Sequence, residues 1–130
     1  ISPAQVLLEK FIFKSENAWR AKRLKLLPRL HNAGFVVRKA VGSRPVILAS
    51  KLATQFLDDR ENRTLIIKVD ISSSVIAGTI LNLVEPQVKK LDIDLAFIVE
   101  GATDDELPEV PFGSICFHKL DLSKFKRFDG

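Results

Sequence analysis

The stretch Thr64–Leu91, TLIIKVDISSSVIAGTILNLVEPQVKKL, decides the expected fold because its hydrophobic period changes part-way along. Apolar and polar residues alternate through Thr64–Ile71, which is the period-two pattern of a half-buried β-strand. Through Ser74–Leu91 the apolar residues instead recur at the helical period and cluster on one side. The sequence therefore predicts a strand followed by one long amphipathic helix.

Three serines, Ser72–Ser74, join these two patterns, and two interpretations of them stay open. A phosphate-binding turn needs glycine for close backbone approach to its ligand, and no glycine lies between Lys68 and Ala77. Hydroxyl side chains are preferred helix N-caps, which explains the serines without any ligand. We favour the cap, and a capped helix end can still face a ligand head group.

The flanking segments complete an α+β pattern. Ser2 and Pro3 predict the start of an N-terminal helix, and Ser15 predicts the start of a second helix that Pro28 ends. Further strands are expected at Phe35–Val41, Val46–Leu57, Leu91–Val99 and Phe112–Leu122. Short connections between successive strands favour an antiparallel, curved sheet packed against the long helix.

Length and composition are those of one globular domain, which we expect to span 1–130 and to end in a loose tail at 123–130. The chain has 46% hydrophobic and 28% charged residues, with no bilayer-spanning segment and no signal-peptide pattern. The single cysteine, Cys116, favours a reducing intracellular compartment, and an organelle reached after leader removal stays open. Because the chain contains no methionine, we expect a fragment or a processed product.

The charge of the chain is divided unevenly. Residues 1–65 hold 13 Lys and Arg against 5 Asp and Glu, a net charge of +8, whereas residues 66–130 hold 7 against 11, a net charge of −4. The first half is either an anion-facing surface or a solvated polar face. The candidate contacts for an anion or a lipid headgroup are Arg20, Lys22, Arg23, Arg38, Lys39 and Lys68. Since few aromatic residues accompany them, nucleic acid is not an expected partner, and an anionic lipid or membrane surface is.

Catalytic and metal-binding patterns are weak in this sequence. Cys116 and His118 share one strand face, but no third group is identified to orient them, and His31 lies far away along the chain. The acidic segment Asp104–Glu109 lacks the alternating ligands and the turn glycine of a calcium-binding EF-hand loop. The sequence therefore predicts no enzyme activity, no metal site and no cofactor.

Three segments carry a family resemblance when they are taken in order. They read LKLLPRLHNAGFVVRKAVGSRPVILASKL, LIIKVDISSSVIAGTI and LAFIVEGATDDELPEVPFGSICFHKLDLS. Together they resemble the C-terminal domain of the plant enhanced disease resistance 2 family over about Phe11–Ser123. The family-motif positions, to which the resemblance assigns no role, are Pro28, Gly42, Asp70, Ser73, Ser74, Glu106, Leu107, Pro108 and Gly113.

The resemblance implies a non-enzymatic, lipid- or membrane-associated regulatory domain. In the family this domain follows a pleckstrin-homology domain and a START lipid-binding domain, or occurs alone, and the family is linked to negative control of salicylate-dependent defence. We expect the chain to correspond to the C-terminal portion of the family domain. The alternative is a structural or interaction subunit of a larger, membrane-bound assembly, in which a protein partner covers a sheet edge left open by absent upstream strands. The sequence departs from the family pattern at Ser72, where the family has glycine.

Overall fold

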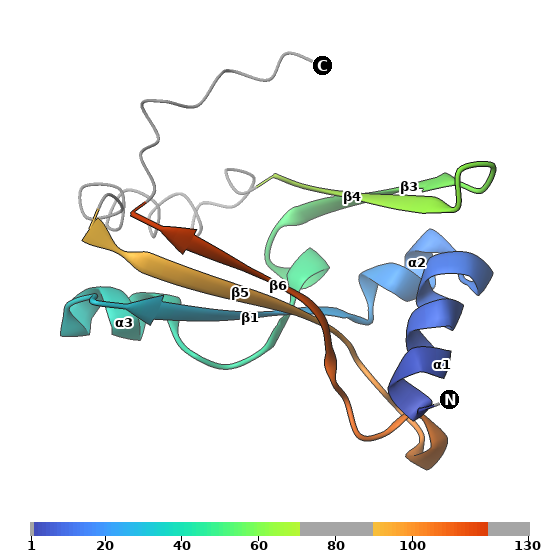
Figure 1. Cartoon of the computed structure of the whole chain (residues 1–130), viewed down its shortest axis with the longest axis horizontal. Helices are drawn as coiled ribbons and strands as arrows, with labels where there is room; N and C mark the ends of the chain where they lie inside the picture. Colours follow the sequence, from blue (N-terminus) through green and yellow to red (C-terminus); the bar gives the residue numbers. More distant parts are fainter. Residues whose placement is uncertain (1, 71–89, 120–130) are drawn as a thin grey trace.

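The computed structural model describes residues 2–70 and 90–119 (Figure 1). Its strands form two antiparallel sheets, one of four strands in the order β2-β1-β5-β6 and one that is the β3–β4 hairpin. The serine cap with its motif positions Ser73 and Ser74, the tail at 123–130, and all but the last two residues of the long helix expected at Ser74–Leu91 lie outside the described residues. The α+β class, the N-terminal helix and the antiparallel pairing are confirmed, although the strands belong to two sheets.

The N-terminal helical segment begins as the sequence predicts. Helix α1 spans Pro3–Glu9 and continues into a π-helical turn at Lys10–Lys14. The Ser2 hydroxyl accepts a hydrogen bond from the backbone N–H of Gln5 at 3.2 Å, and the Gln5 side chain accepts one from the Ser2 N–H at 2.8 Å. This reciprocal capping box satisfies two backbone donors that the helix cannot satisfy internally.

The expected second helix is wrong at both ends. Helix α2 is only Asn17–Ala21, and Ser15 is a buried residue whose hydroxyl donates to the Lys10 carbonyl at 2.7 Å. The segment towards Pro28 is strand β1, Leu24–His31, which pairs along its whole length with β5, Asp92–Val99. Pairing with a strand so distant in sequence overrides the local helical pattern.

Strand β1 tolerates Pro28 because of where that residue lies. Strand β2, Val46–Ile47, pairs only with Lys25 and Leu26, so Pro28 lies beyond the stretch of β1 that has a described partner on both sides. Proline lacks an N–H to donate and is found in strands mainly along such edges. The expectation that Pro28 ends a helix is therefore replaced by a proline at a half-open strand edge.

Two further strand predictions are corrected. Phe35–Val41 is helix α3, which starts after Gly34 and ends at Gly42, where φ is 77° and the N–H bonds to the Arg38 carbonyl at 2.9 Å. Glycine takes this left-handed conformation readily, so a helix of valine-rich sequence can close there. Val46–Leu57 is interrupted by a 3₁₀ turn at Leu48–Ser50, since the Leu48 side chain is buried in the core.

The remaining strands agree with the sequence pattern. Strand β4 spans Thr64–Asp70 with half-buried and exposed residues in strict alternation, and it pairs with β3, Ala53–Asp59. Strand β6 spans Pro111–His118 and pairs with β5. These strands could be predicted because successive side chains of a strand point to opposite faces of the sheet, so a half-buried strand shows alternating apolar and polar residues.

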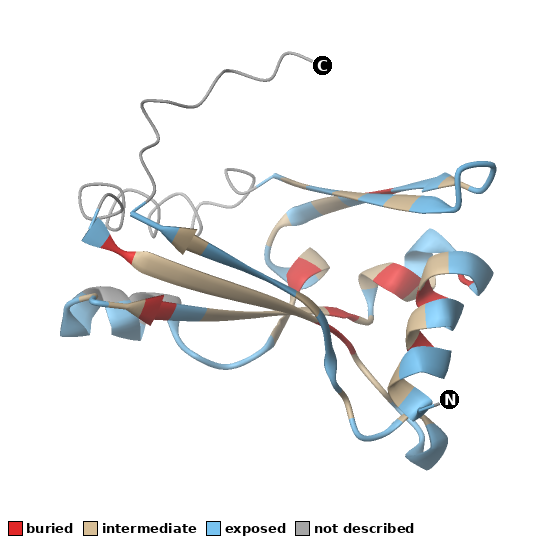
Figure 2. Cartoon of the chain, in the orientation of Figure 1, coloured by how far each residue is buried: buried red, intermediate tan, exposed pale blue. Residues whose placement is uncertain are grey.

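The core lies where the N-terminal helices meet the strands. Its buried members are Leu7, Phe11, Leu24, Leu48, Phe56 and Val99. The Phe11 ring lies 6.1 Å from that of Phe56 in an edge-on arrangement and 6.4 Å from that of Trp19, within the range of favourable aromatic pairs. Figure 2 shows buried positions in both the helical segment and the strands beside it.

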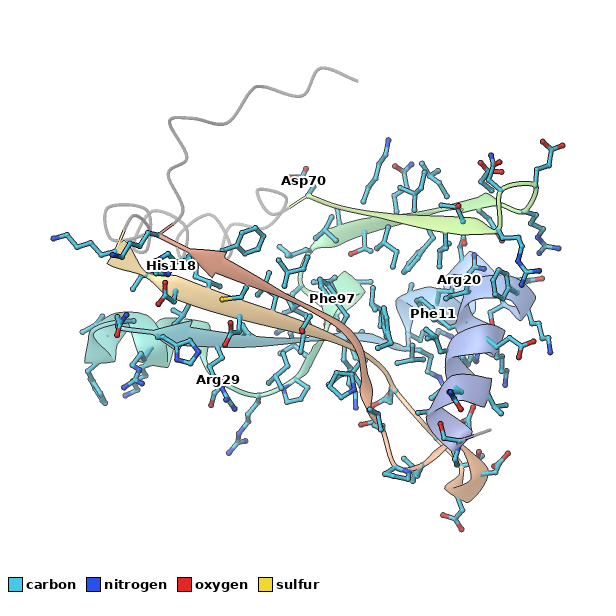
Figure 3. The ribbon with its side chains drawn as sticks, in the orientation of Figure 1. Phe11, Arg20, Arg29, Asp70, Phe97 and His118 are labelled. Atoms are coloured by element: carbon cyan, nitrogen blue, oxygen red, sulfur yellow. The ribbon has the colours of Figure 1, made fainter. Side chains whose placement is uncertain are left out.

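Arg20 is the most deeply buried charged residue in the described part of the chain, with a side chain that is 1% exposed (Figure 3). Its guanidinium donates to the carbonyls of Phe11 and Ile12, each at 2.7 Å, and to the side chains of Asn17 at 2.8 Å and Asp58 at 3.2 Å. Asn17 in turn donates to the Phe56 carbonyl at 3.1 Å. One side chain therefore fastens the end of the helical segment to strand β3.

We predict that Arg20→Met lowers the free energy of unfolding by about 3 kcal/mol, because it leaves buried carbonyls and Asp58 without their donor. Urea titration followed by the fluorescence of Trp19 measures this loss. The control is Lys22→Gln, which removes an exposed cation two residues away and should change stability by no more than about 0.5 kcal/mol. Equal stability of the two variants would contradict the role given to Arg20.

Candidate functional site

The basic cluster near the N-terminus consists of Arg20, Lys22, Arg23 and Lys25. Most of its cations are bound by acceptors and carboxylates of the protein itself. Arg20 is saturated by protein acceptors, and the Arg23 guanidinium donates to the Glu100 carbonyl at 3.0 Å and lies over the Trp19 ring at 5.0 Å. Lys25 lies 2.9 Å from Glu109 and 3.2 Å from Glu100. Of the predicted headgroup contacts in this cluster, only Lys22 is exposed, so the cluster does not form a free anion site.

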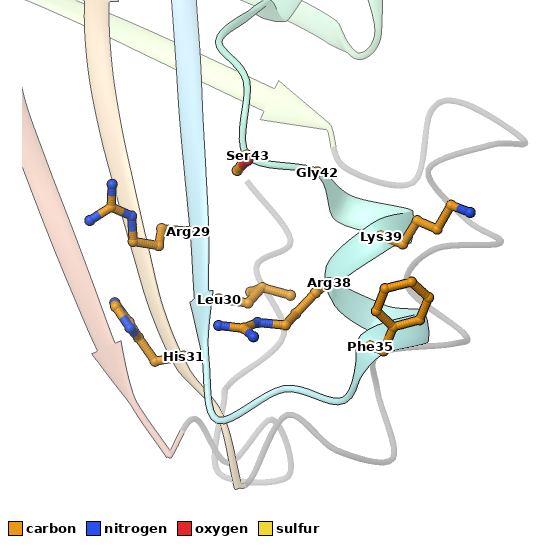
Figure 4. A pocket seen from close by; sticks show the side chains of 8 residues that line it. All are labelled: Arg29, Leu30, His31, Phe35, Arg38, Lys39, Gly42 and Ser43. Atoms are coloured by element: carbon orange, nitrogen blue, oxygen red, sulfur yellow. The ribbon is translucent and has the colours of Figure 1, made fainter.

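A second group of cations surrounds a groove of about 810 Å³ between strand β1 and helix α3 (Figure 4). The groove exists because Asn32, with φ of 62°, turns the chain out of β1, and α3 then returns along the strand until Gly42 ends it. Asparagine and glycine are the residues that adopt positive φ most readily. The groove is lined by Arg29, Leu30, His31, Phe35, Arg38, Lys39, Gly42 and Ser43.

The side chains of this basic groove divide into two sets. Arg38 extends from α3 towards β1, and Arg29 and His31 lie two residues apart on that strand (Figure 4). Phe35 and Lys39 also line the groove, but Figure 4 shows their side chains directed away from β1, with the Lys39 ammonium 5.9 Å from the centre of the Phe35 ring. Among the described residues, no carboxylate forms an ion pair with Arg29, Arg38 or Lys39.

A polar patch on three neighbouring strands adjoins the groove. The register of the sheet places Arg29, Asp94 and Cys116 in one row and His31, Asp92 and His118 in the next. His31 Nε2 lies 2.7 Å from Asp94 Oδ2, and His118 Nδ1 contacts Asp92. Among residues 2–70 and 90–119, no group of three His, Cys, Asp or Glu side chains could hold a metal ion.

The carboxylate of Asp94 bonds to both Cys116 and His31 in this patch, and these bonds shift the pKa values of Asp94 and Cys116. Its hydrogen bond with Cys116, together with burial and the nearby charge of Asp92, raises the pKa of the Cys116 thiol above its ordinary value. The hydrogen bonds from Cys116 and then from His31 lower the pKa of Asp94. A nucleophilic cysteine needs the thiolate form, which this environment disfavours.

Sequence reasoning missed Arg29 and His31 as groove residues. The expected helix ended at Pro28 and the next strand was expected only from Phe35, so no strand was predicted that would put residues 29 and 31 on one face. The available signal was the spacing of two basic residues at i and i+2 directly after a proline. The other predicted contact, Lys68, is exposed on β4 of the second sheet, opposite Gln55, and does not line the groove.

Comparison with known proteins identifies the family of this chain. Residues 2–121 match the family described as "Protein ENHANCED DISEASE RESISTANCE 2, C-terminal". The chain belongs to this family. A relative from Arabidopsis thaliana, "Protein ENHANCED DISEASE RESISTANCE 2-like", is 33% identical over 117 residues, which cover 90% of this chain and 16% of the relative. No solved structure matches the chain.

In this member of the enhanced disease resistance 2 C-terminal family, the described motif positions lie at or next to the groove, in strands, and in the loop between β5 and β6. Pro28 directly precedes groove residue Arg29, and Gly42 ends α3 at the groove. Asp70 is the last residue of β4, and Gly113 pairs with Phe97 in the sheet. The other described positions, Glu106, Leu107 and Pro108, belong to the β5–β6 loop.

The acidic part of this loop is a structural clamp. Glu106 accepts a hydrogen bond from the Ala102 N–H at 3.1 Å, and Glu109 accepts one from the Gly101 N–H at 3.0 Å and contacts Lys25. A Cβ atom on Gly101 would lie 2.7 Å from the Glu106 carbonyl oxygen, so only glycine fits there. The loop thus closes on itself and against the N-terminal cations.

Protonation of the clamp is linked to stability. The hydrogen bond from the Ala102 N–H, assisted by Thr103, Lys10 and Arg23, lowers the pKa of Glu106. For Lys25, burial lowers the pKa, but Glu109 and Glu100 outweigh it, so the net pKa is raised. The contribution of Lys25 to stability is therefore complete below its unfolded pKa and is lost as pH rises through its folded pKa. The contribution of Glu106 is complete above its unfolded pKa and is lost as pH falls through its folded pKa.

We predict that Glu106→Gln reduces the acid sensitivity of the protein. Because folding lowers the pKa of Glu106, its contribution is complete above the ordinary value of 4.5 and is lost as pH falls through the folded value. Urea unfolding at pH 7 and about pH 3.5 should show a smaller loss of stability for the variant than for the wild type. Glu61→Gln, in the exposed β3–β4 turn, is the matched control. An unchanged loss on acidification in Glu106→Gln would refute the clamp.

Proposed function

We propose that this chain is a non-enzymatic regulatory domain that attaches to anionic membrane surfaces through helix α3. The observation that carries the proposal is the exposure of two apolar side chains beside cations on one seven-residue helix: Phe35 is 78% and Val36 65% exposed, next to Arg38 and Lys39. Exposed aromatic and aliphatic groups enter the interfacial region of a bilayer, while neighbouring cations are attracted to anionic headgroups.

The expected strength follows from these few groups. Each Lys or Arg near an anionic surface contributes about 1 kcal/mol. Transfer of Phe35 out of water adds about 2 kcal/mol. The sum of about 4 kcal/mol corresponds to weak, reversible association, on the order of a millimolar dissociation constant. Such binding suits one contact among several in a longer protein, and the chain spans 16% of the length of the curated relative it matches.

The proposed role needs no catalytic group, and the environment of Cys116 supports this. A thiol whose pKa is raised by an adjacent Asp94 carboxylate is a poor nucleophile. Among the described helices, none is long and apolar enough to cross a membrane. The contact proposed for α3 is one at the surface of the bilayer.

Vesicle flotation at about 150 mM salt tests the membrane contact, since screening at this ionic strength suppresses diffuse attraction. We predict greater recovery with phosphatidylcholine–phosphatidylserine vesicles than with phosphatidylcholine alone. Phe35→Ala should weaken partitioning about tenfold, because its lost apolar burial exceeds 1.4 kcal/mol. Lys39→Gln should weaken it about fivefold.

Matched controls remove the same kind of side chain elsewhere. Ile66→Ala deletes an exposed apolar group from β4, Lys51→Gln removes an exposed cation, and Cys116→Ala removes the thiol. All three should float like the wild type. Equal recovery from both vesicle types, or the same loss in Ile66→Ala as in Phe35→Ala, would exclude α3 as the membrane contact.

A second function, that of an interaction subunit in a larger assembly, is favoured by strand β6. This strand ends the order β2-β1-β5-β6, so no described strand pairs with its outer edge. Ile115 is 47% and Phe112 38% exposed on it. An edge strand with exposed apolar side chains offers its backbone groups to a strand from another chain.

Light scattering after size exclusion tests this second function in the simplest case, association between copies of the chain. We predict a mass above 14.6 kDa that rises with concentration and returns to 14.6 kDa in Ile115→Lys, because a charge on an edge strand opposes pairing. Ile66→Lys is the control on the other sheet. A constant mass of 14.6 kDa for the wild type would count against self-association through β6.

A further inference from the structure

We infer that the groove between β1 and α3 selectively binds a phosphate monoester, the group presented by a phosphorylated lipid headgroup or by a soluble inositol or sugar phosphate. The inference deepens the proposed membrane contact and rests on it for the lipid source. It depends on different side chains of the groove, however: on Arg29 and His31 of β1 and Arg38 of α3, and not on Phe35 and Lys39, which Figure 4 shows directed away from β1.

The first argument is that guanidinium groups from two different elements line one groove. Arg29 belongs to β1 and Arg38 to α3, and Figure 4 shows Arg38 directed towards β1 and the Arg29 side chain on the side of β1 away from α3. A guanidinium donates in a planar fork that matches two oxygens of a phosphate. The groove therefore offers one such fork from the strand and one from the helix.

The second argument is that these cations are not bound in ion pairs. Neither Arg29 nor Arg38 forms an ion pair with a described carboxylate, whereas Arg20 and Arg23 are held by Asp58 and Glu106. Asp94 on β5 lies directly opposite Arg29, whose charge helps to lower the pKa of Asp94, but Asp94 bonds to His31 and Cys116 and does not line the groove. Even with the charge of Asp94 included, Arg29, Arg38 and Lys39 leave the groove positive, and a concave positive site concentrates anions.

The third argument concerns His31. Its Nε2 lies 2.7 Å from Asp94 Oδ2, which leaves Nδ1 without a partner among the described residues. When the imidazole is protonated, both ring nitrogens donate, so Nδ1–H becomes a third donor on the groove wall while Nε2–H stays bonded to Asp94.

The charge of the groove and its hydrogen-bond donors favour a phosphate monoester over a diester. A phosphate monoester carries a charge of about −1.5 to −2 near neutral pH and three free acceptor oxygens. The forks of Arg29 and Arg38, with Nδ1–H of His31 when its ring is protonated, supply donors for all three of these oxygens. The phosphate of phosphatidylserine is a diester with only two free oxygens. At about 810 Å³ the groove is also in the size range of small-molecule sites, so it can hold a headgroup and not just an ion.

Vesicle binding at matched surface potential tests the selectivity. Phosphatidylcholine vesicles containing phosphatidic acid, a monoester, should bind the wild-type chain about tenfold more tightly than vesicles containing phosphatidylserine, which is the effect of one additional charge-assisted contact. Arg29→Gln and Arg38→Gln should remove this preference. Arg38→Lys keeps the charge without the fork and should retain only part of it.

Arg60→Gln is the matched control, since Arg60 lies in the turn of the other sheet with a 76% exposed side chain. It should keep the full preference for phosphatidic acid. Thermal unfolding of every variant shows whether the fold is intact. An equal loss in Arg60→Gln and Arg38→Gln would overturn the inference, because it would reduce the effect to total charge.

A soluble competitor separates the two sources of the phosphate. Inositol monophosphate at millimolar concentration should displace the chain from phosphatidic acid vesicles if the groove recognises the monoester itself. Binding of the soluble phosphate without vesicle flotation would support the groove and refute the membrane function. Flotation without headgroup preference and without displacement would refute the groove and leave the membrane contact of Phe35 in place.

Discussion

The buried guanidinium of Arg20 is the interaction on which the described structure depends. It satisfies two carbonyls at the end of the N-terminal helical segment and reaches Asp58 on β3, so it joins elements that share no backbone pairing. A buried guanidinium is stable only when its N–H groups have hydrogen-bond acceptors. This requirement fixes the positions of the acceptors around Arg20. The aromatic contacts of Phe11 with Phe56 and Trp19 form around this anchor.

This use of charge explains why the functional surface is narrower than the net charge of the first half suggests. Arg20, Arg23 and Lys25 are neutralised by carboxylates or carbonyls brought from β3 and from the β5–β6 loop. The arginines and the lysine around α3, Arg29, Arg38 and Lys39, are among the cations that form no ion pair with a described carboxylate. The ion pairs formed elsewhere therefore decide which cations can contribute to the two proposals.

Sequence patterns predicted the elements in which local and tertiary preferences agree. The alternation in Thr64–Asp70 corresponds to a strand with one half-buried face, and Ser2 with Gln5 forms the cap that its spacing predicts. The helix predicted up to Pro28 and the strand predicted at Phe35–Val41 were wrong, because long-range pairing of β1 with β5 outweighs the first pattern and glycine-bounded helix closure outweighs the second. Since strand β1 was not predicted, Arg29 and His31 were not placed together at the groove.

The sequence by itself determined the family, the α+β class with antiparallel strands, the excess of positive charge in the first half and the candidate residues Arg38 and Lys39. Only the tertiary structure decided which cations remain free and which groups surround them. His31 and Asp94 are 63 residues apart in the chain and become neighbours through strand register. Composition fixes how many charges a chain carries, but pairing between distant strands fixes which of them neutralise one another.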